Sequence, residues 1–420
     1  MLRTLVIGGG VIGATTAYFL SEAGHDVTVV DRGPSLAAEC SFANGGMLHA
    51  SHTEPWNTPE AIGQLLRWIG REDSPLLLRP GQIPNLIGWG LGFLRYSRAS
   101  HHERNTRVNA RLAVYSQQVM DDIRAREDIA YDHQTAGIVK IFRDPAELDA
   151  ARQASEMIRG TGVDFDMLDT EGVLALEPAL EDIRRELVGG VFYPRDESGD
   201  CRIFSEELGR LVHRRGADIR LGETVRRLEG DGRGVTGVVT DRGTLTADRY
   251  VLAAGVDAPL LVKPLGFRLP IKPVKGYSAT LTVAGLPGAP TMPIIDEGRK
   301  LVITRLGGRL RVAGTAEFAG YDYTIHRARV EAVLRQALLN LPTLAAEVDV
   351  AQAEPWACLR PMTVDGPPLL GASPVSNLFL NTGAGHLGWT FAAGAGRVVA
   401  DIVSDREPEI DMDGLTLQRY

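Results

Sequence analysis

Cysteine is scarce in this sequence, and its three copies show no disulfide or metal-binding pattern. Cys40, Cys201 and Cys358 stand far apart, are odd in number and have no CxxC spacing. This usage excludes a secreted fold held by disulfides, argues against a zinc site and fits a reducing compartment. We therefore expect neutral thiols, no metal ion and a cytoplasmic protein.

Long apolar runs and basic blocks are also missing. No stretch approaches the roughly 18 unbroken apolar residues of a membrane-spanning helix. Residues 1–10 lack the basic start, apolar core and cleavage site of a signal peptide and are typical of a strand instead. The formal charge of -8 has no Lys/Arg-rich block to offset it locally, which disfavours nucleic acid as a partner. A small molecule is the expected ligand.

The sequence does contain the start of an α/β fold. Its 420 residues allow two or three domains at roughly 150 residues per domain, with a core that can surround a cofactor. Apolar patterning predicts a strand at 5–7, a tight turn, a helix at 11–22 and a strand at 27–30. Two parallel strands joined by a Gly-rich turn within about 30 residues open a doubly wound, Rossmann-like sheet.

The simple alternation of strand and helix stops after residue 55. Residues 56–100 are rich in Trp, Leu, Gly and Pro, and residues 101–130 have a helical spacing. Helices are predicted at 204–215, with a cap region at Ser205, Glu206 and Glu207, and at 388–405. Further strands are predicted at 219–221, 235–240, 250–254, 277–283, 301–305, 310–313 and 378–381.

This order predicts two interleaved domains. A Rossmann-like nucleotide-binding domain is expected at residues 1–55, 190–265 and 345–420. A second, α+β domain with a mainly antiparallel sheet is expected at residues 56–189 and 266–344. The nucleotide-binding domain is therefore discontinuous in sequence.

A phosphate-binding turn opens the chain. Gly8, Gly10 and Gly13 form G-x-G-x-x-G, whose missing side chains let the backbone and a helix N-terminus approach a pyrophosphate. Asp31 ends the second strand about 20 residues on, where a carboxylate accepts both ribose hydroxyls. This acidic residue disfavours NADP and leaves NAD and FAD open. The small-residue stretch 41–47 favours FAD, because it suits backbone threading past a pyrophosphate and a flavin ring.

Seven blocks of sequence, in order along nearly the whole chain, resemble the bacterial FAD-dependent D-amino acid dehydrogenases within the wider glycine oxidase and D-amino acid oxidase group. The blocks are VIGGGVIG at 6–13, SFANGG at 41–46, DESGDC at 196–201, PVKGYS at 273–278, ITRLGGRLRVAGTAEF at 303–318, LRPMTVDG at 359–366 and NTGAGHLGWT at 381–390. The resemblance implies an FAD-binding sheet domain interleaved with a substrate-binding domain dominated by an antiparallel sheet.

The resemblance also implies where FAD is held. Asp31 and Arg32 would face the adenosine ribose, Ser41 the pyrophosphate and the backbone of Val225 the adenine. The other implied cofactor residues are Asn44, Gly45, Gly46 and Met47 against the flavin, Ala254 and Gly255 beneath the cofactor, and Gly8, Gly10, Val11, Ile12, Gly13, Arg360, Gly385, His386, Leu387, Gly388, Trp389 and Thr390.

The turn at 383–390 carries a chemical argument. It lies where a strand becomes the last helix, so that orphan amides and the positive end of the helix dipole point at one ligand. In the family that this sequence resembles, that ligand is the N1 and C2 carbonyl edge of the flavin. Hydride arriving at N5 leaves negative charge there, which preorganised donors stabilise. A plain Gly-rich turn that caps a helix is the alternative.

Three side chains are candidates for binding an amino-acid substrate. A carboxylate needs a planar cationic fork, which Arg supplies better than Lys. Arg305 interrupts an apolar strand and Arg360 lies at a strand exit, and by residue type each fits a ligand or a structural salt bridge equally. The resemblance favours both and adds the Tyr277 hydroxyl, for which burial in the sheet is the alternative.

His49 and His52 follow the predicted flavin loop. The dehydrogenases that this sequence resembles usually show a Gly-Tyr pair at positions matching Ser51 and His52, so His52 is the clearest departure. A His there can recognise a polar substrate group or tune proton release, and a solvated loop His is the alternative. We count His52 with Tyr277, Arg305 and Arg360 as a candidate catalytic residue.

Residues 86–93, with Trp68 and Trp89, are apolar but too short to span a bilayer. They predict either an interfacial patch or a buried helix. Members of the resembling family that feed electrons to a respiratory quinone associate peripherally with membranes. This implies the inner face of the cytoplasmic membrane as a further location.

Together these features predict a flavin-dependent oxidation, and the resemblance implies oxidative deamination of a D-amino acid, with a D-proline or hydroxy-D-proline type of substrate kept open. Hydride would pass from the alpha carbon to flavin N5, and electrons to a quinone or another non-oxygen acceptor. Two alternatives remain: a glycine- or sarcosine-type amine oxidase that uses oxygen, and a flavin-bound non-catalytic subunit of a larger complex. The oligomeric state is left open.

Overall fold

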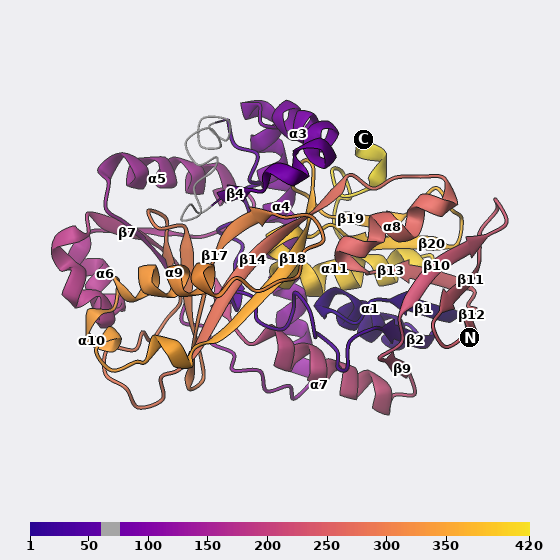
Figure 1. The fold of residues 1–420 in the computed structure, drawn as a ribbon, viewed down its shortest axis with the longest axis horizontal. Coiled ribbons are helices and arrows are strands. Elements are labelled where there is room, and N and C mark those ends of the chain that lie inside the picture. Colours follow the sequence, from indigo (N-terminus) through magenta and orange to yellow (C-terminus); the bar gives the residue numbers. More distant parts are fainter. Residues whose placement is uncertain (60–75) are drawn as a thin grey trace.

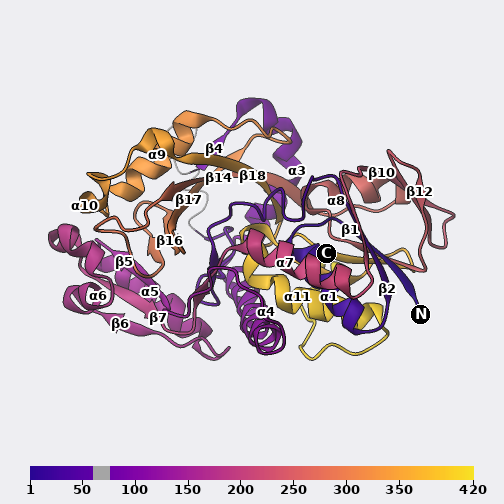
Figure 2. The same cartoon turned by 90° about the horizontal axis from the view of Figure 1, so that it is seen from below.

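The computed structural model describes residues 1–59 and 76–420, and within these ranges two large β-sheets form the framework (Figure 1). One sheet has six strands and contains the N-terminal strand, and the other has nine and contains the long strands from the middle of the chain. The long helix α4 (Ala99–Arg126) lies between the two halves (Figure 2). This architecture confirms the predicted α/β class.

The six-stranded sheet begins as the sequence predicts. β1 (Arg3–Ile7) and β2 (Asp26–Asp31) pair in parallel and are joined by α1 (Val11–Glu22). All neighbours are parallel except β19, which runs antiparallel to β20. The order across the sheet is β19 (Leu369–Ala372), β20 (Leu378–Thr382), β13 (Arg249–Leu252), β1, β2 and β9 (Asp218–Leu221).

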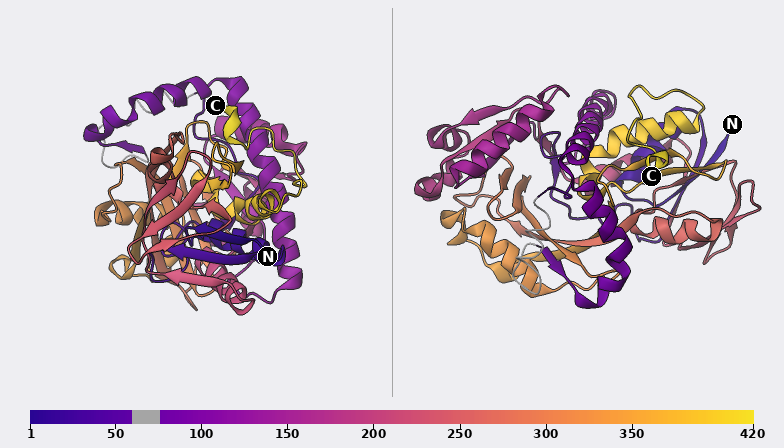
Figure 3. Two further views of the ribbon diagram at one scale, coloured as in Figure 1. Left: turned by 90° about the vertical axis from the view of Figure 1, so that its right-hand side faces the viewer. Right: turned by 90° about the horizontal axis from the view of Figure 1, so that it is seen from above.

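Alternate side chains of β1 enter two different cores, which explains its unbroken apolar sequence. Val6 packs with helices on one face, and Leu5 and Ile7 pack with a small antiparallel sheet and α8 on the other. Figure 3 shows α11 in yellow beside α4 in purple. The elements on the two faces are α7 (Cys201–Arg214), α11 (Gly388–Val403), α8 (Ala258–Val262), β10 (Val225–Gly230), β11 (Val235–Thr240) and β12 (Thr244–Leu245).

The nine-stranded sheet is antiparallel except at the pairs β15–β5 and β17–β4. Its strands in order are β18 (Glu354–Thr363), β14 (Ile271–Thr282), β17 (Arg309–Phe318), β16 (Leu301–Leu306), β15 (Ile294–Asp296), β5 (Ile138–Phe142), β7 (Gly189–Tyr193) and β6 (Asp166–Leu168), with β4 (Leu76–Leu78) beside β17.

The two faces of the nine-stranded sheet differ in what covers them. Tyr277, Ala279 and Leu281 of β14 pack into a core with α6 (Thr170–Leu176), α9 (Arg327–Leu338) and α10 (Pro342–Ala345). The intervening residues Val274, Gly276 and Ser278 face a cavity instead. The period-2 alternation of the strand therefore separates a structural face from a ligand-facing one.

Two predictions about helices need correction. The helix α7 begins at Cys201, and its N-cap is Asp200, whose carboxylate accepts from the amides of Arg202 and Ile203. The predicted cap at 205–207 is wrong, since those residues lie inside the helix. The apolar stretch 86–93 lies in α3 (Ile83–Tyr96), no residue of which is buried, so the buried-helix alternative is wrong as well.

Sheet membership also differs from the predicted domain ranges. The strands β7 and β18 pair within the nine-stranded sheet, although residues 190–265 and 345–420 were assigned to the nucleotide-binding domain. The pairing of β18 with β14 joins segments about 80 residues apart, which no local pattern reveals. The division into two domains otherwise stays a prediction. A further short pair, β3 (Met47–Leu48) with β8 (Glu197–Ser198), leads out of the predicted flavin loop.

Candidate functional site

A cavity of about 1210 Å³ runs from the carboxyl ends of β1 and β2 to the uncovered face of the nine-stranded sheet. It exceeds the roughly 300–1,000 Å³ of sites for drug-sized ligands. Its walls come from both sheets, from α3 and from α5 (Pro145–Arg159). A ligand as long as a dinucleotide, together with a small substrate, therefore has room in it.

The glycine turn at the head of α1 is shaped by close backbone contacts. Gly8 has φ +112, and a Cβ there would lie 2.5 Å from the carbonyl oxygen of Ala253. A Cβ at Gly13 would lie 1.9 Å from the carbonyl oxygen of Gly8. Gly8, Gly10, Val11 and Ile12 line the cavity. Gly13 does not line it, and its role is to let α1 pack against β1.

Asp31 and Arg32 lie at the end of β2 and both line the cavity. The Asp31 carboxylate accepts from the amides of Gly9 and Gly33, each at 2.6 Å. Burial raises the pKa of Asp31, against the opposing effect of those two amides. The guanidinium of Arg32 is already paired with Glu39 at 2.5 Å and with Asp257 at 2.7 Å. Arg32 therefore holds Glu39 and Asp257 in place in the cavity wall, and its charge is largely neutralised by them.

The loop at 41–47 is fastened to the nine-stranded sheet through three successive carbonyl groups. Ser278 Oγ donates to the carbonyl of Ala43 at 2.6 Å, Arg311 Nη1 to that of Asn44 at 3.1 Å, and Thr304 Oγ1 to that of Gly45 at 2.7 Å. At its other end, Ser41 Oγ accepts from the amide of Val11 at 3.0 Å. The loop thus bridges the two sheets along the cavity, where all the predicted loop residues lie: Ser41, Asn44, Gly45, Gly46 and Met47.

The remaining predicted cofactor residues lie at two other parts of the cavity wall. Val225, at the start of β10, and Ala254 and Gly255, after β13, line one end. Gly385, His386, Gly388 and Trp389 line the other, where α11 begins. Leu387 is buried away from the cavity, and Thr390 Oγ1 accepts from the amide of His49 at 3.4 Å.

This lining fits an FAD molecule. Bare glycine backbone lies at the head of α1, and the N-cap residue Gly10 has no side chain to cap the helix, so the helix dipole is available to a pyrophosphate beside the Ser41 hydroxyl that binds the Val11 amide. The half-buried Asp31 carboxylate lies where ribose hydroxyls are bound in such turns. The cavity then continues along the loop at 41–47 to the N-terminus of α11, which also lacks a side-chain cap.

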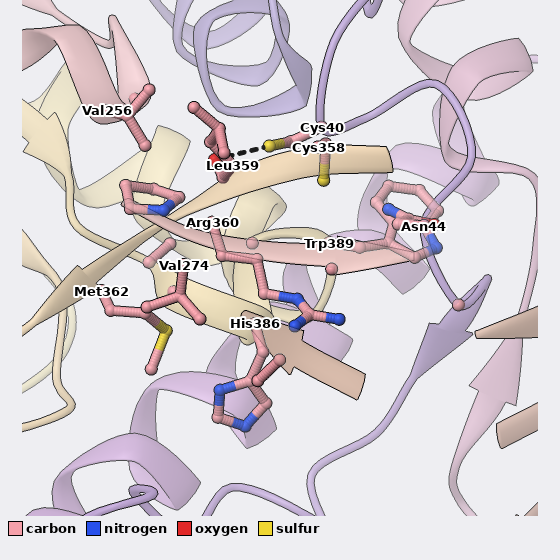
Figure 4. Close-up of a pocket in the computed structure, with 18 of the residues that line it drawn as sticks. Cys40, Asn44, Val256, Val274, Cys358, Leu359, Arg360, Met362, His386 and Trp389 are labelled. Carbon is pink, nitrogen blue, oxygen red and sulfur yellow. Dashed lines mark hydrogen bonds between the residues drawn. The ribbon is translucent and has the colours of Figure 1, made fainter. Parts of the chain in front are cut away.

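Arg360 extends from β18 into the cavity near His386 (Figure 4). Its guanidinium lies over Gly276, where a Cβ would come within 2.3 Å of Cζ, and 5.5 Å from the ring of Trp56. Nη1 donates to the carbonyl of Thr315 at 2.9 Å. Within residues 1–59 and 76–420 no carboxylate forms an ion pair with it, and its enclosure lowers its pKa. Arg360 is thus a cation facing the cavity without a counter-ion.

The structure does not bring Tyr277 and Arg305 together with Arg360. Tyr277 borders the cavity, but its hydroxyl donates to buried Glu317 at 2.6 Å and its ring belongs to the core beneath α9. Arg305 does not line the cavity, and its Nε donates to the carbonyl of Gly307 at 3.1 Å. The predicted role of Arg305 is wrong on this geometry. The role of Tyr277, which lies in the cavity wall with its hydroxyl bonded to Glu317, stays a prediction.

His52 lies in the cavity wall and is not a solvated loop residue. Its Nδ1 is 3.3 Å from Lys140 Nζ, and Lys140 in turn pairs with Glu297 at 2.7 Å. Burial and the neighbouring Lys140 lower the pKa of His52. Lys140 and Glu297 were not predicted as site residues, because each reaches the site from a strand remote in sequence from the flavin loop.

Comparison with known proteins agrees with this site. The family model described as FAD dependent oxidoreductase matches residues 3–402. A D-amino acid dehydrogenase of Paramagnetospirillum magneticum is 46% identical over 100% of this chain and 99% of that protein, and one of Allorhizobium ampelinum is 42% identical with the same coverage. A glycine oxidase structure from Geobacillus kaustophilus shares the fold, with a TM-score of 0.77 and 24% identity over 100% of both chains.

Proposed function

Because the chain belongs to the family of FAD-dependent oxidoreductases, we propose that it oxidises a D-amino acid to the imino acid, which water then hydrolyses. The relatives of 46% and 42% identity, both named D-amino acid dehydrogenase, support this substrate class. The observation that supports the proposal most is Arg360, a cation on the cavity wall that has no carboxylate partner in the described part of the chain.

Bound FAD would supply the two-electron acceptor that takes hydride from the alpha carbon. The amides and dipole at the N-terminus of α11 lie in the cavity wall and would favour negative charge on a cofactor bound there. Asp31 and the turn at the head of α1 would hold the opposite end of the cofactor. The chain therefore contributes orientation and electrostatics, and neither a covalent nucleophile nor a metal is part of the proposal.

Arg360 binds and orients the substrate carboxylate. One of its N–H groups is fixed to the Thr315 carbonyl, which sets the plane of the fork and leaves the other N–H groups for the substrate. Thr315 has φ +58, a rare and strained value for a β-branched residue. Such strain is typical of binding sites, where surrounding contacts hold a backbone in place. The positive charge of Arg360 also disfavours the ammonium form of the nearby amine, which has to be neutral for hydride to leave.

Anaerobic mixing of the FAD-loaded protein with D- and L-amino acids tests the proposal. The visible flavin band is expected to bleach with D-amino acids. Arg360→Leu is expected to keep FAD and to lower kcat/KM about 10- to 100-fold, the cost of a charge-assisted hydrogen bond. Arg305→Leu is the matched control and is expected to behave like the parent. No bleaching by any D-amino acid, or equal effects of the two substitutions, would contradict the proposal.

The proposed electron acceptor is a quinone, and the proposed location is the inner face of the cytoplasmic membrane. Leu86, Trp89 and Phe93 of α3 line the cavity, while Ile87 and Leu91 on the same helix are 58% and 66% exposed. An apolar helix face of this kind suits the interface of a bilayer. Trp68, named with this patch in the sequence, lies outside the described residues. No helix in the described part of the chain is long and apolar enough to cross a membrane.

Flotation with vesicles of anionic phospholipid tests membrane contact. The parent is expected to float, and Leu91→Glu to stay in the dense fraction with its FAD spectrum unchanged. Leu339→Glu is the control, because Leu339 is 52% exposed at a different surface. Equal flotation of the two variants would remove the membrane contact from the proposal.

An amine oxidase that passes electrons to oxygen is the second candidate, favoured by the structural likeness to glycine oxidase. Peroxide formation separates it from the dehydrogenase. During turnover of a D-amino acid in air, the dehydrogenase is expected to reduce a quinone analogue and to release little peroxide. A non-catalytic flavin subunit would show neither reaction.

A further inference from the structure

The cavity ends, beyond His386, in a polar recess that the reaction outlined above does not use. We define the histidine recess by the six residues that line it: His49, His52, Glu54, Lys140, Glu297 and Lys300. Burial is the main cause that lowers the pKa of His386. Electrostatic interactions with His52, Arg360 and His49 lower it further, so both the recess and Arg360 lie near His386. The ring of Trp56 contacts both His386, at 5.1 Å between ring centres, and Arg360, at 5.5 Å from Cζ.

Contacts within the recess fix the proton on one nitrogen of His52. Lys140 Nζ lies 2.7 Å from Glu297 Oε1 and 3.3 Å from His52 Nδ1. Although burial opposes it, Glu297 raises the pKa of Lys140, so this nitrogen is an ammonium group and can only donate. Glu54 Oε2 and Glu297 Oε1 also lie 3.5 Å and 3.8 Å from Nδ1, but within the described residues only the contact with Lys140 has hydrogen-bond geometry. Neutral His52 therefore accepts at Nδ1 and carries its proton on Nε2. No residue in the described ranges accepts a hydrogen bond from Nε2.

The second imidazole is enclosed, and one of its nitrogens has no hydrogen bond. His49 is 9% exposed, and its buried Nδ1 has no partner among residues 1–59 and 76–420. Its ring centre is 5.7 Å from that of His52. Burial lowers its pKa to about 3, so it stays neutral at any physiological pH. An enclosed imidazole nitrogen without a partner is costly unless a ligand completes its bonding.

The charges of the recess cancel. Lys140 and Lys300 both pair with Glu297, at 2.7 Å each, and Glu54 lies 3.5 Å from His52. Two positive and two negative groups leave no net charge. A charged substrate side chain would break this balance at a desolvation cost, and a purely apolar one would leave the Nε2–H of His52 unpaired. A hydroxyl group meets both needs, since it accepts from one imidazole and can donate to another.

We propose that the histidine recess selects D-amino acids that carry a hydroxyl group on the side chain, with His52 Nε2–H as the donor to that oxygen. The inference rests on the proposed function, because the carboxylate held by Arg360 aims the side chain at the recess. His52 and His49 are thus specificity-determining residues, and Lys140 is the positioning residue that sets the proton on His52.

Pairs of substrates that differ only in the hydroxyl test this. D-serine against D-2-aminobutyrate, and cis-4-hydroxy-D-proline against D-proline, are compared by kcat/KM with a dye acceptor. The parent is expected to favour the hydroxylated member of at least one pair by about 10-fold, the usual value of one such bond. In His52→Leu that ratio is expected to fall towards 1. In His52→Gln it is expected to persist, because the glutamine amide can donate from a position close to that of Nε2.

His326→Leu is the control, because His326 is partly exposed and lies outside the cavity, and it is expected to keep the ratio of the parent. A parent that turns over D-alanine with no preference for the hydroxyl in either pair would overturn the inference and leave the proposed function standing. Failure to oxidise any D-amino acid would overturn both. The comparison of the two substrates of each pair in the parent protein tests the inference even if His52→Leu fails to fold.

Discussion

Arg305 and Arg360 have the same side chain and opposite surroundings, and the difference comes from strand parity. Arg305 shares the orientation of Leu301 and Ile303, whose side chains pack beneath α9. Arg360 lies opposite Val274 in the ladder, and Val274 lines the cavity. A cation binds an anionic ligand best where no carboxylate already pairs with it, and among the residues that the structure describes none pairs with Arg360. For single residues, burial and pairing decide function more than residue type.

His49 makes the folded protein sensitive to acid. Its pKa is about 3 in the folded state and roughly 6.5 when unfolded, so between these values the unfolded chain binds the extra proton. Its contribution to stability is therefore lost as pH falls from about 6.5 towards 3. In His49→Gln the free energy of unfolding is expected to decline less steeply, by up to about 1.4 kcal/mol per pH unit. Denaturant unfolding at several pH values measures this, and parallel profiles would contradict it.

Asp196 acts in the opposite direction. Burial raises its pKa to about 7, although Ser51, Ala50 and Gln117 all donate hydrogen bonds to its carboxylate. Between pH of roughly 4 and 7 the folded state keeps a proton that the unfolded chain has released, so stability falls as pH rises through this range.

The substitution Asp196→Asn removes this titration. We expect the melting temperature of the variant minus that of the parent, both measured with saturating FAD, to increase as pH rises from 5 to 8. Ala50 and Ser51 both donate to Asp196 and directly precede His52. The same data therefore report on the contacts that hold the His52 backbone in place. A constant difference in melting temperature over this range would show that Asp196 does not titrate there.

At the scale of elements, the packing of α1 on β1 depends on a missing side chain. A Cβ at Gly13 would lie 1.9 Å from the carbonyl oxygen of Gly8, and backbone cannot yield as a side chain can. Gly13→Ala is expected to cost about 1–3 kcal/mol in stability and to lower the FAD content of the purified protein. Absorbance of the flavin and thermal unfolding measure both effects.

Gly160→Ala is the matched control for Gly13→Ala. Gly160 ends α5 with φ -65, and nothing lies within 4 Å of a Cβ added there. We expect this variant to keep the flavin content and melting temperature of the parent. If both variants behaved alike, the close approach at Gly13 would not limit the packing of α1.

At the scale of the whole molecule, the loop at 41–47 connects two sheets whose strands are remote in sequence. Arg311 is 4% exposed, and it donates to Asn44 from β17 and to Thr280 from its Nε at 2.6 Å. Arg311→Met leaves the Asn44 carbonyl without its charged donor. We expect the dissociation constant of FAD to rise about tenfold or more, the cost of losing a hydrogen bond to a charged group.

Titration of the apoprotein with FAD measures that constant. Arg309→Met is the control, because Arg309 lies on the same strand and pairs with Asp132 and Asp200 but does not touch the loop. Its FAD affinity is expected to stay near that of the parent. Equal losses in both variants would indicate a general effect on β17 and not on the bridge between the sheets.

The sequence by itself determined what depends on neighbours along the chain. The first strand, α1, the second strand and the G-x-G-x-x-G turn follow from apolar period and from glycine, and the resemblance of seven blocks led to the family and to FAD, both of which are confirmed. The boundaries of helices were less secure. The cap of α7, for instance, is Asp200 and not the predicted residues one turn later.

Only the tertiary structure decided which side chains meet at the substrate end of the cavity. Lys140, Glu297 and His52 come from three separate segments, and their contacts set the proton on one imidazole. Arg360 lines the cavity and Arg305 does not, because strand pairing and parity fix which face each side chain takes. Pairings between segments remote in sequence are chosen by the burial of the whole core. No pattern within a single segment contains that information.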